Sequence, residues 1–206
     1  MRSSVARAFL IVVALLLGVD VARAEEPVIV VLGDSLTAGL GLLPDEAYPV
    51  LLEQRLRREG FAYRVVNAGV SGDTTAAGLR RVEWVLRSRP AIVIVALGAN
   101  DGLRHQSGAA MRDNLVAIVR RLQGAGATVL LAGMRVPPNY GDAYARDFSA
   151  AFATVARRSG AAFMPFLLDG VAAQAALNQP DGIHPTVTGH AVIAERLWPF
   201  LVPLVR

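Results

Sequence analysis

The sequence contains no cysteine and no lysine. Without cysteine, the chain can form no disulfide bond, no thiolate metal site and no thiol nucleophile. All 21 basic residues are arginine. Arginine pairs such as Arg57-Arg58 and Arg157-Arg158 fall on the polar faces of predicted helices, which is typical of solvated helix surfaces rather than of a binding patch.

The sequence also lacks an apolar run long enough to cross a membrane. The run near the N-terminus, Ala8 to Val19, has twelve residues, whereas a spanning helix needs roughly 18 to 20. Two arginines precede it and Ala22-Arg23-Ala24 follows it, a pattern typical of a cleaved secretory signal. We therefore expect residues 1–24 to be a signal peptide, with an uncleaved anchor as the alternative, and the mature chain to keep no stable membrane anchor.

Charge excludes a further class of function. The proposed leader carries three arginines and one aspartate, so its removal lowers the formal charge from +4 to +2. So small an excess does not indicate binding to nucleic acid. The remaining residues 25–206 are enough for one domain with a well-buried core, and we expect a monomer acting on a small-molecule substrate.

Apolar runs of strand length alternate with longer segments of helical period along the mature chain. The runs show little polar alternation, as expected for strands covered on both faces. The alternation predicts an α/β fold in which a five-stranded parallel sheet lies between two layers of helices. The predicted strands are 28–32, 63–67, 91–97, 128–132 and 161–164, and the predicted helices are 48–59, 74–88, 109–124, 143–159 and 188–199.

Small polar residues follow the predicted strands. Residues 33–36 (GDSL) end the first strand, residues 67–74 end the second and residues 98–101 (GAND) end the third, while residues 181–184 (DGIH) precede the last helix. Functional groups in an open parallel sheet collect beyond the carboxyl ends of the strands. We therefore expect these four segments to meet at one rim.

The residue types at this rim are those of nucleophilic catalysis. The Ser35 hydroxyl needs a base, and His184 is suited because the free pKa of imidazole is near neutrality. Asp181, three residues earlier, can accept a hydrogen bond from the other ring nitrogen. The side-chain amide of Asn100 and the backbone amides of Gly72 and Ser35 are candidate donors to an oxyanion.

These four segments, in this order, resemble the conserved blocks of the SGNH hydrolases, also called GDSL esterases and lipases. The resemblance covers essentially the whole mature chain and is strongest to the bacterial periplasmic thioesterase I, arylesterase and lysophospholipase subgroup. It implies a flavodoxin-like three-layer α/β/α sandwich, a Ser35, Asp181 and His184 triad, an oxyanion hole of Ser35, Gly72 and Asn100, and no metal or cofactor.

Several residues near these motifs have simpler interpretations. We expect the carboxylates of Asp34 and Asp101 to bind turn amides, and His105 and His190 to pack or to face solvent. A metal site built from His190 with Asp181 and His184 lacks a known ligand spacing. Gly69-Val70-Ser71-Gly72 approaches the Gly-x-Ser-x-Gly elbow of α/β-hydrolases, but Asp73 stands at its fifth position.

Apolar residues in the loops beside the rim predict a groove for an acyl chain. The alternative is that they only cover the edge of the core. The resemblance implies hydrolysis of aryl esters, acyl-CoA and lysophospholipids by a periplasmic or secreted enzyme. A carbohydrate acetylesterase on the same fold and a non-catalytic binding module stay as alternatives. The candidate groove residues are Leu42, Leu103, Val136, Pro137 and Tyr140.

Overall fold

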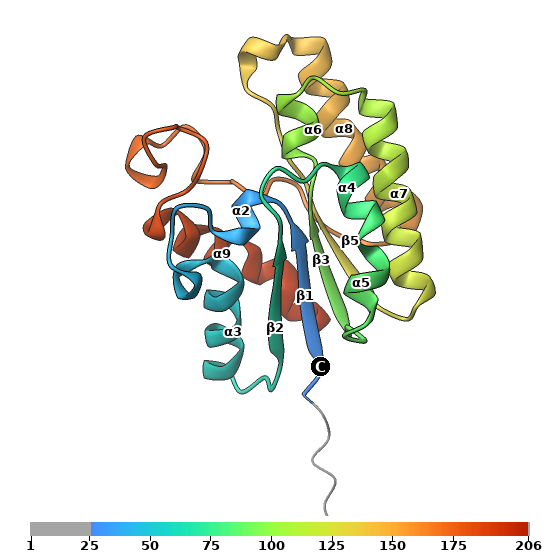
Figure 1. Cartoon of the computed structure of the whole chain (residues 1–206), viewed down its shortest axis with the longest axis vertical. Helices are drawn as coiled ribbons and strands as arrows, with labels where there is room; N and C mark the ends of the chain where they lie inside the picture. Colours follow the sequence, from blue (N-terminus) through green and yellow to red (C-terminus); the bar gives the residue numbers. More distant parts are fainter. Residues whose placement is uncertain (1–25, 206) are drawn as a thin grey trace, which may run out of the picture.

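A computed structural model describes residues 26–205. The proposed signal peptide, residues 1–24, lies outside the described residues. Five parallel strands form one sheet in the order β2-β1-β3-β4-β5. This is the flavodoxin-like order, and it confirms the α/β/α fold class predicted from the sequence (Figure 1). The strands are β1 (Val28–Gly33), β2 (Arg64–Gly69), β3 (Ile92–Ala96), β4 (Thr128–Ala132) and β5 (Ala162–Met164).

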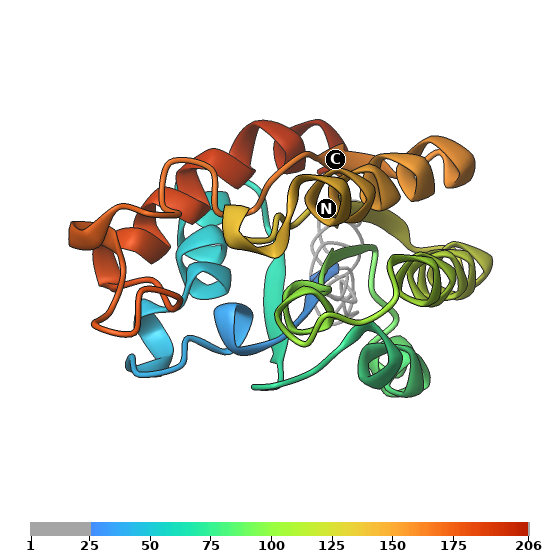
Figure 2. The same cartoon turned by 90° about the horizontal axis from the view of Figure 1, so that it is seen from above.

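Helices cover both faces of the sheet. Helices α3 and α9 pack together on one face, and α4, α5, α7 and α8 pack along the other (Figures 1 and 2). Among residues 26–205, no helix is both long and apolar enough to cross a bilayer. The main helices are α3 (Tyr48–Arg58), α4 (Thr75–Arg80), α5 (Val82–Leu86), α7 (Gly108–Gly124), α8 (Asp142–Ser159) and α9 (Val187–Leu201).

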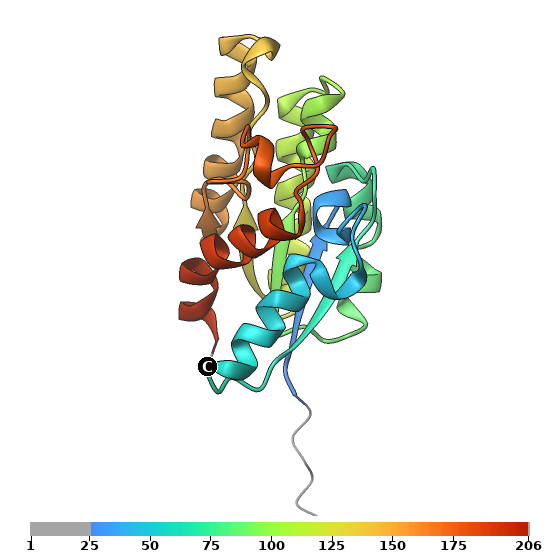
Figure 3. The same ribbon diagram turned by 90° about the vertical axis from the view of Figure 1, so that its left-hand side faces the viewer.

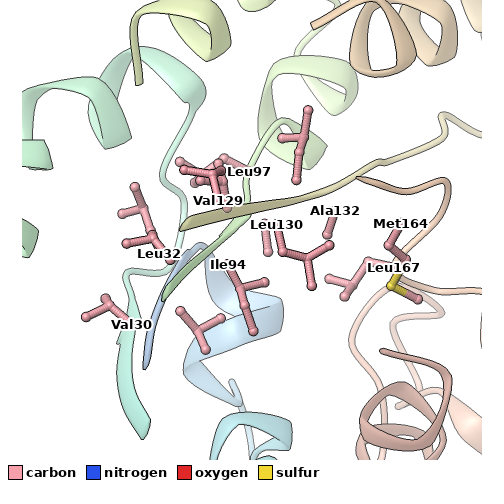
Figure 4. Close-up of a cluster of buried hydrophobic side chains, with 14 of the residues drawn as sticks. Val30, Leu32, Ile94, Leu97, Val129, Leu130, Ala132, Met164 and Leu167 are labelled. Atoms are coloured by element: carbon pink, nitrogen blue, oxygen red, sulfur yellow. The ribbon is translucent and has the colours of Figure 1, made fainter. Parts of the chain in front are cut away.

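Burial explains why the strands read as continuous apolar runs. Every residue of β1 and β3 is buried, because helices lie against both faces of these central strands. The edge strand β2 is only partly buried. Figure 4 shows side chains of the strands and of the segment after β5 packed into one apolar cluster. Replacing a fully buried leucine there, such as Leu130, by alanine should cost about 2–5 kcal/mol of stability.

The single helix predicted over residues 74–88 is wrong. The structure has two short helices, α4 and α5, which meet at Arg81. The backbone of Arg81 has φ −96° and ψ −1°, and its amide reaches back to the carbonyls of Gly78 and Leu79. A helical period in the sequence does not reveal this break, because Arg81 is held by contacts with distant strands.

The sequence also misses several short elements at the sheet's carboxyl end. The four-residue helix α2 (Ser35–Ala38) follows β1, and α6 (Ala99–Leu103) follows β3. Both are shorter than the window over which a helical period can be detected. Residues 26–205 also contain four 3₁₀ helices: η1 (Pro44–Glu46), η2 (Pro138–Tyr140), η3 (Ala175–Leu177) and η4 (Val202–Leu204).

Candidate active site

The nucleophile candidate lies at the point where the chain order of the sheet reverses. Strands β1 and β3 are neighbours, and the chain leaves β1 toward α3 on one face and β3 toward α7 on the other. Ligand sites of open α/β sheets form outside such a switch point. The loops that follow the strands gather at this end of the molecule, uppermost in Figure 3.

Helix α2 holds Ser35 in a tight turn. The Asp34 side chain accepts a hydrogen bond from the Leu36 amide at 3.0 Å, and the Gly39 amide donates to the Ser35 carbonyl at 3.1 Å. A Cβ on Gly33 would lie 1.9 Å from Oγ1 of Thr37. Only glycine therefore fits directly before this turn, and the serine has little freedom to move.

Three side chains form a hydrogen-bonded chain at the rim. Nε2 of His184 lies 3.0 Å from Oγ of Ser35, and Nδ1 of His184 lies 2.6 Å from Oδ2 of Asp181. Ser71, the alternative serine, also lines the cavity, but the imidazole bonds to Ser35. A serine, an imidazole and a carboxylate in this order can transfer a proton away from an attacking hydroxyl.

The Asp181 turn preorganises the imidazole. Oδ1 of Asp181 accepts hydrogen bonds from the amides of Ile183 at 2.9 Å and His184 at 3.0 Å. Gly182 between them has φ +70°, a conformation that glycine adopts without strain. The hydrogen bond from the His184 ring, followed by those from the two amides, lowers the pKa of Asp181 to about 2. This carboxylate is ionised at any pH at which His184 could act as a base.

Two backbone amides at the cavity are free to donate. Within the part of the chain that the structure describes, the N–H groups of Ser35 and Gly72 have no protein acceptor, and both residues line the cavity. Gly72 has φ +84°, and only the Arg104 guanidinium approaches the position of its missing Cβ. Such unpaired donors suit a developing negative charge on a bound oxygen.

Asn100 is the third candidate donor, and its amide is already engaged. Nδ2 donates to the carbonyl of Asp73 at 3.0 Å and to Oδ2 of Asp34 at 3.3 Å. The longer of the two bonds is the weaker. A substrate oxygen can therefore replace Asp34 as an acceptor while the bond to Asp73 keeps the amide in place.

A set of hydrogen bonds from Arg81, which was not predicted from the sequence, holds the loop that contains Gly72. Its guanidinium donates to Oδ2 of Asp73 at 2.7 Å and to the carbonyls of Ala68 at 3.1 Å and Gly33 at 3.2 Å. It therefore ties the ends of β1 and β2 to the loop that contains Gly72. A sequence signal that could have suggested it is the Arg80-Arg81 pair, which lies between two short helical segments a few residues after the loop.

Asp34 and Asp101 bind turn groups, as predicted. Asp34 is wholly inaccessible to solvent, and burial raises its pKa to about 6 against the opposing effect of its hydrogen bonds. Asp101 accepts from the amide of Thr75 at 2.8 Å and from its hydroxyl at 2.6 Å. Neither carboxylate bonds to His184, so their role in this geometry is to support the turns.

The other two histidines pack against tyrosines. Nδ1 of the buried His190 accepts a hydrogen bond from the Tyr48 amide at 3.1 Å, and burial lowers the pKa of His190 to about 4. His105 stacks on Tyr144 with 4.3 Å between ring centres. Among residues 26–205, no three histidine, aspartate or glutamate side chains gather where a metal ion could be held.

A cavity of about 670 Å³ opens beside Ser35 and His184. Its lining includes the predicted residues Leu103, Val136 and Pro137. Leu42 and Tyr140 are not among its lining residues, and their part in substrate binding stays a prediction. The Tyr140 hydroxyl donates a hydrogen bond to the carbonyl of the lining residue Leu103 at 3.2 Å. Apolar lining residues that the sequence missed are Leu36, Leu40, Met134, Phe166, Leu168 and Ile183.

Two physical reasons explain why some of the apolar lining residues were not predicted from the sequence. Leu40 lies two residues before the predicted Leu42, and a loop without periodicity does not show which of its leucines faces the cavity. Phe166 and Leu168 follow β5, the shortest strand. Functional groups of an open parallel sheet collect beyond the carboxyl ends of its strands. Applying this rule to the segment after β5 as well would have predicted that Phe166 and Leu168 line the cavity.

Comparison with known proteins places the chain in a family. A model described as "GDSL-like Lipase/Acylhydrolase family" matches residues 31–192. "Esterase TesA" of Pseudomonas aeruginosa is 42% identical over 184 residues, which cover 89% of this chain and 92% of that protein. "Thioesterase 1/protease 1/lysophospholipase L1" of Escherichia coli K12 is 36% identical over 184 residues, covering 89% and 87%.

Comparison with a solved structure supports the same family. The psychrotrophic esterase EstA from Pseudoalteromonas sp., inhibited by monoethylphosphonate, superposes with a TM-score of 0.82 at 32% identity, covering 86% of this chain and 98% of that one. The family predicted from the four sequence blocks is thus confirmed. The chain belongs to the GDSL-like lipase/acylhydrolase family and is a serine hydrolase.

Proposed function

We propose that the mature chain hydrolyses carboxylic esters and acyl thioesters through an acyl-enzyme, with aryl esters, acyl-CoA and lysophospholipids as substrate classes. The observation that carries this proposal is the continuous contact from Ser35 through His184 to Asp181, at 3.0 and 2.6 Å, beside an apolar cavity. The names of the relatives, an esterase and a thioesterase, point to the same chemistry.

Acylation begins at Ser35. Its Oγ attacks the carbonyl carbon of the ester while Nε2 of His184 removes the hydroxyl proton. Asp181 holds the Nδ1–H and stabilises the imidazolium that forms. The imidazolium then returns its proton to the leaving alcohol or thiol, and the bond between carbonyl carbon and leaving group breaks.

The carbonyl oxygen becomes negatively charged in this step. The free amides of Ser35 and Gly72 donate to it, and the Asn100 amide exchanges its weak bond to Asp34 for one to the oxyanion. A donor aimed at charge that appears only in the transition state raises kcat more than it lowers KM.

Deacylation repeats the sequence with water. The freed imidazole of His184 removes a proton from water as the water oxygen attacks the acyl carbon. The imidazolium then gives this proton to Oγ of Ser35, the bond between the acyl carbon and Oγ breaks, and the carboxylic acid is released. Asp181 is ionised throughout, since its pKa is held near 2. Each half-reaction therefore begins and ends with a neutral His184 and an ionised Asp181, while Ser35 alternates between the free hydroxyl and the acyl ester.

The cavity favours an acyl chain over an acetylated glycan. More than half of its lining residues are leucine, isoleucine, valine, methionine, phenylalanine, proline or alanine, and its carboxylate and guanidinium groups are those of Asp34 and Arg135. An apolar groove stabilises methylene groups by removing them from water. A glycan needs polar partners for its many hydroxyl groups, and only a minority of the lining residues have polar side chains.

Replacement of Ser35 by alanine tests the proposal. Hydrolysis of p-nitrophenyl butyrate should fall by about four or more orders of magnitude, and labelling by a fluorophosphonate should disappear while the thermal unfolding temperature stays close to that of the wild type. Ser71→Ala should still be labelled. Undiminished turnover by Ser35→Ala would refute the assignment, and a wild-type chain that neither turns over nor labels would indicate a binding module.

We further propose that residues 1–24 direct export and are removed, so that the enzyme works in the periplasm or outside the cell as a monomer. Mass spectrometry of the protein expressed in a Gram-negative host should find a chain that begins at Glu25. A chain that retains Met1, or scattering that gives a dimer, would contradict the respective part.

A further inference from the structure

A second cavity lies against the catalytic one. It has a volume of about 850 Å³ and lies between the segment after β5 and helix α9. Among the described residues, Arg135 and Phe166 line both cavities, and every other lining residue belongs to one cavity alone. These two side chains are thus the wall between the cavities.

The two side chains of this wall are in contact through one cation–π interaction. The Arg135 guanidinium lies 4.8 Å from the centre of the Phe166 ring. Arg135 follows β4 and Phe166 follows β5, two strands that are paired at Ala132 and Met164.

No hydrogen bond or ion pair holds the Arg135 guanidinium within residues 26–205, whereas that of Arg81 has three acceptors. A cation–π contact at an exposed site is weak. The two side chains can therefore separate without disturbing the strands that carry them.

The chemistry of the second cavity suits an alkyl chain. Apolar side chains make up just over half of its lining, and the charged lining residues Arg135, Asp169, Glu195 and Arg196 are all exposed to solvent. A chain of methylene groups can lie on this surface without burying a charge. The apolar lining is Met164, Pro165, Phe166, Val192, Pro199 and Phe200.

We propose that the second cavity is the distal part of the acyl site and that the Arg135–Phe166 pair sets how far an acyl chain reaches. Short acyl chains end at the pair, inside the catalytic cavity. Long acyl chains displace the pair and place their terminal carbons in the second cavity. This inference rests on the proposed function, because it requires the acyl chain to occupy the catalytic cavity.

Esters that share one leaving group test the proposal. We would measure kcat/KM for p-nitrophenyl butyrate, octanoate and palmitate, so that a change in the palmitate-to-butyrate ratio reports only on the acyl chain. Phe166→Ala joins the cavities and should raise this ratio by at least about ten-fold. Arg135→Met keeps an apolar stem but removes the cation, and should raise it by about two- to five-fold.

Filling the second cavity should have the opposite effect. Val192 lies on α9 and lines the second cavity alone. Val192→Phe should lower the palmitate-to-butyrate ratio in the wild-type background and cancel the gain of Phe166→Ala in the double variant. The single variant at Val192 keeps the proposal testable even where Phe166→Ala does not fold.

Phe163→Ala is the matched control, because Phe163 lies on β5 but lines neither cavity. Its ratio should stay within about two-fold of the wild type. An unchanged ratio in both Phe166→Ala and Val192→Phe, with Ser35 still labelled by a fluorophosphonate, would overturn the chain-length role and leave the proposed function standing. A wild-type protein without ester turnover would overturn the proposed function itself.

Discussion

The turn after β1 and the turn before α9 each bring a carboxylate to the rim, and the two carboxylates behave oppositely. Asp34 is wholly buried and its pKa is raised to about 6, because burial outweighs its hydrogen bonds. The Asp181 side chain is 45% exposed, and three hydrogen bonds lower its pKa to about 2. Solvent and donors together keep Asp181 charged, whereas burial makes the charge of Asp34 depend on pH.

The difference shows why the exposed carboxylate is the one suited to hold a catalytic imidazole. An orienting acid must stay ionised while the histidine gains and loses a proton. Asp181 meets that condition at every pH above about 4. Asp34 is half protonated near pH 6, so it suits a structural position in the turn that holds Ser35.

Removing the charge of Asp181 should have the largest effect on activity. Asp181→Asn keeps the shape of the side chain but stabilises neither the correct imidazole tautomer nor the imidazolium. We expect kcat for p-nitrophenyl butyrate to fall by about ten thousand-fold. Asp113→Asn is the control, since Asp113 lies 72% exposed on α7, away from the cavity. A decrease below about ten-fold would contradict the role given to Asp181.

Asn100→Ala removes the side-chain amide that donates to Asp34 and that we propose as an oxyanion donor. Losing one such donor should lower kcat by about 100- to 1,000-fold with little change in KM, because the oxyanion exists only in the transition state. Steady-state kinetics on one aryl ester separate the two constants. An effect confined to KM would mean that the amide binds the ground state instead.

Asp34→Asn tests the buried carboxylate through pH. The folded state binds a proton more tightly than the unfolded chain between about pH 4 and 6, so the contribution of Asp34 to stability falls as pH rises through that window. The shift from 3.8 to about 6 corresponds to about 3 kcal/mol.

Urea unfolding at pH 4 and pH 7 measures this contribution. The free energy of unfolding of Asp34→Asn, relative to the wild type, should rise by about 3 kcal/mol between the two pH values. A difference that stays flat would show that Asp34 is charged in the folded protein at pH 4. For Asp181 the sign reverses: its lowered pKa stabilises the fold above about pH 4, and this contribution is lost as pH falls toward 2.

The smallest predicted effect concerns the backbone of the exposed turn. Gly182 and Gly60 both have positive φ with open space around the missing Cβ. Alanine at either position should therefore cost only the backbone strain, about 1–2 kcal/mol. Gly182→Ala should in addition lower kcat, by about three- to ten-fold, because it tilts the turn that aims His184. Equal kcat in both variants would show that the turn geometry is not limiting.

Much of the fold could be read from the sequence because of burial. Central parallel strands are covered on both faces, so β1, β3 and β4 appear as plain apolar runs, and glycines or polar turns separate them from the helices. The break at Arg81 could not be read in this way. It depends on carbonyls at the ends of β1 and β2, and no local pattern records which strand ends lie side by side.

The candidate active site likewise has features that could be predicted from local sequence and features that could not. The identities of Ser35, Asp181 and His184 follow from residue type and from the position of each motif at a predicted strand end or helix start. The exchange of acceptors at Asn100 does not follow, because it requires Asp34 and Asp73, which lie 66 and 27 residues away along the chain, to meet one amide. That Leu40 lines the cavity could not be predicted either, because a loop has no period that shows which of its leucines faces inward.

The alternation of strands and helices, the family and the residue types at the rim could be predicted from the sequence, since they depend on local composition and on the order of short motifs. The unpaired amides, the carboxylate that stays charged and the lining of two cavities by Arg135 and Phe166 depend on the three-dimensional structure. Those properties arise from distances and solvent exposure, and both are set by the packing of segments that are remote in the chain.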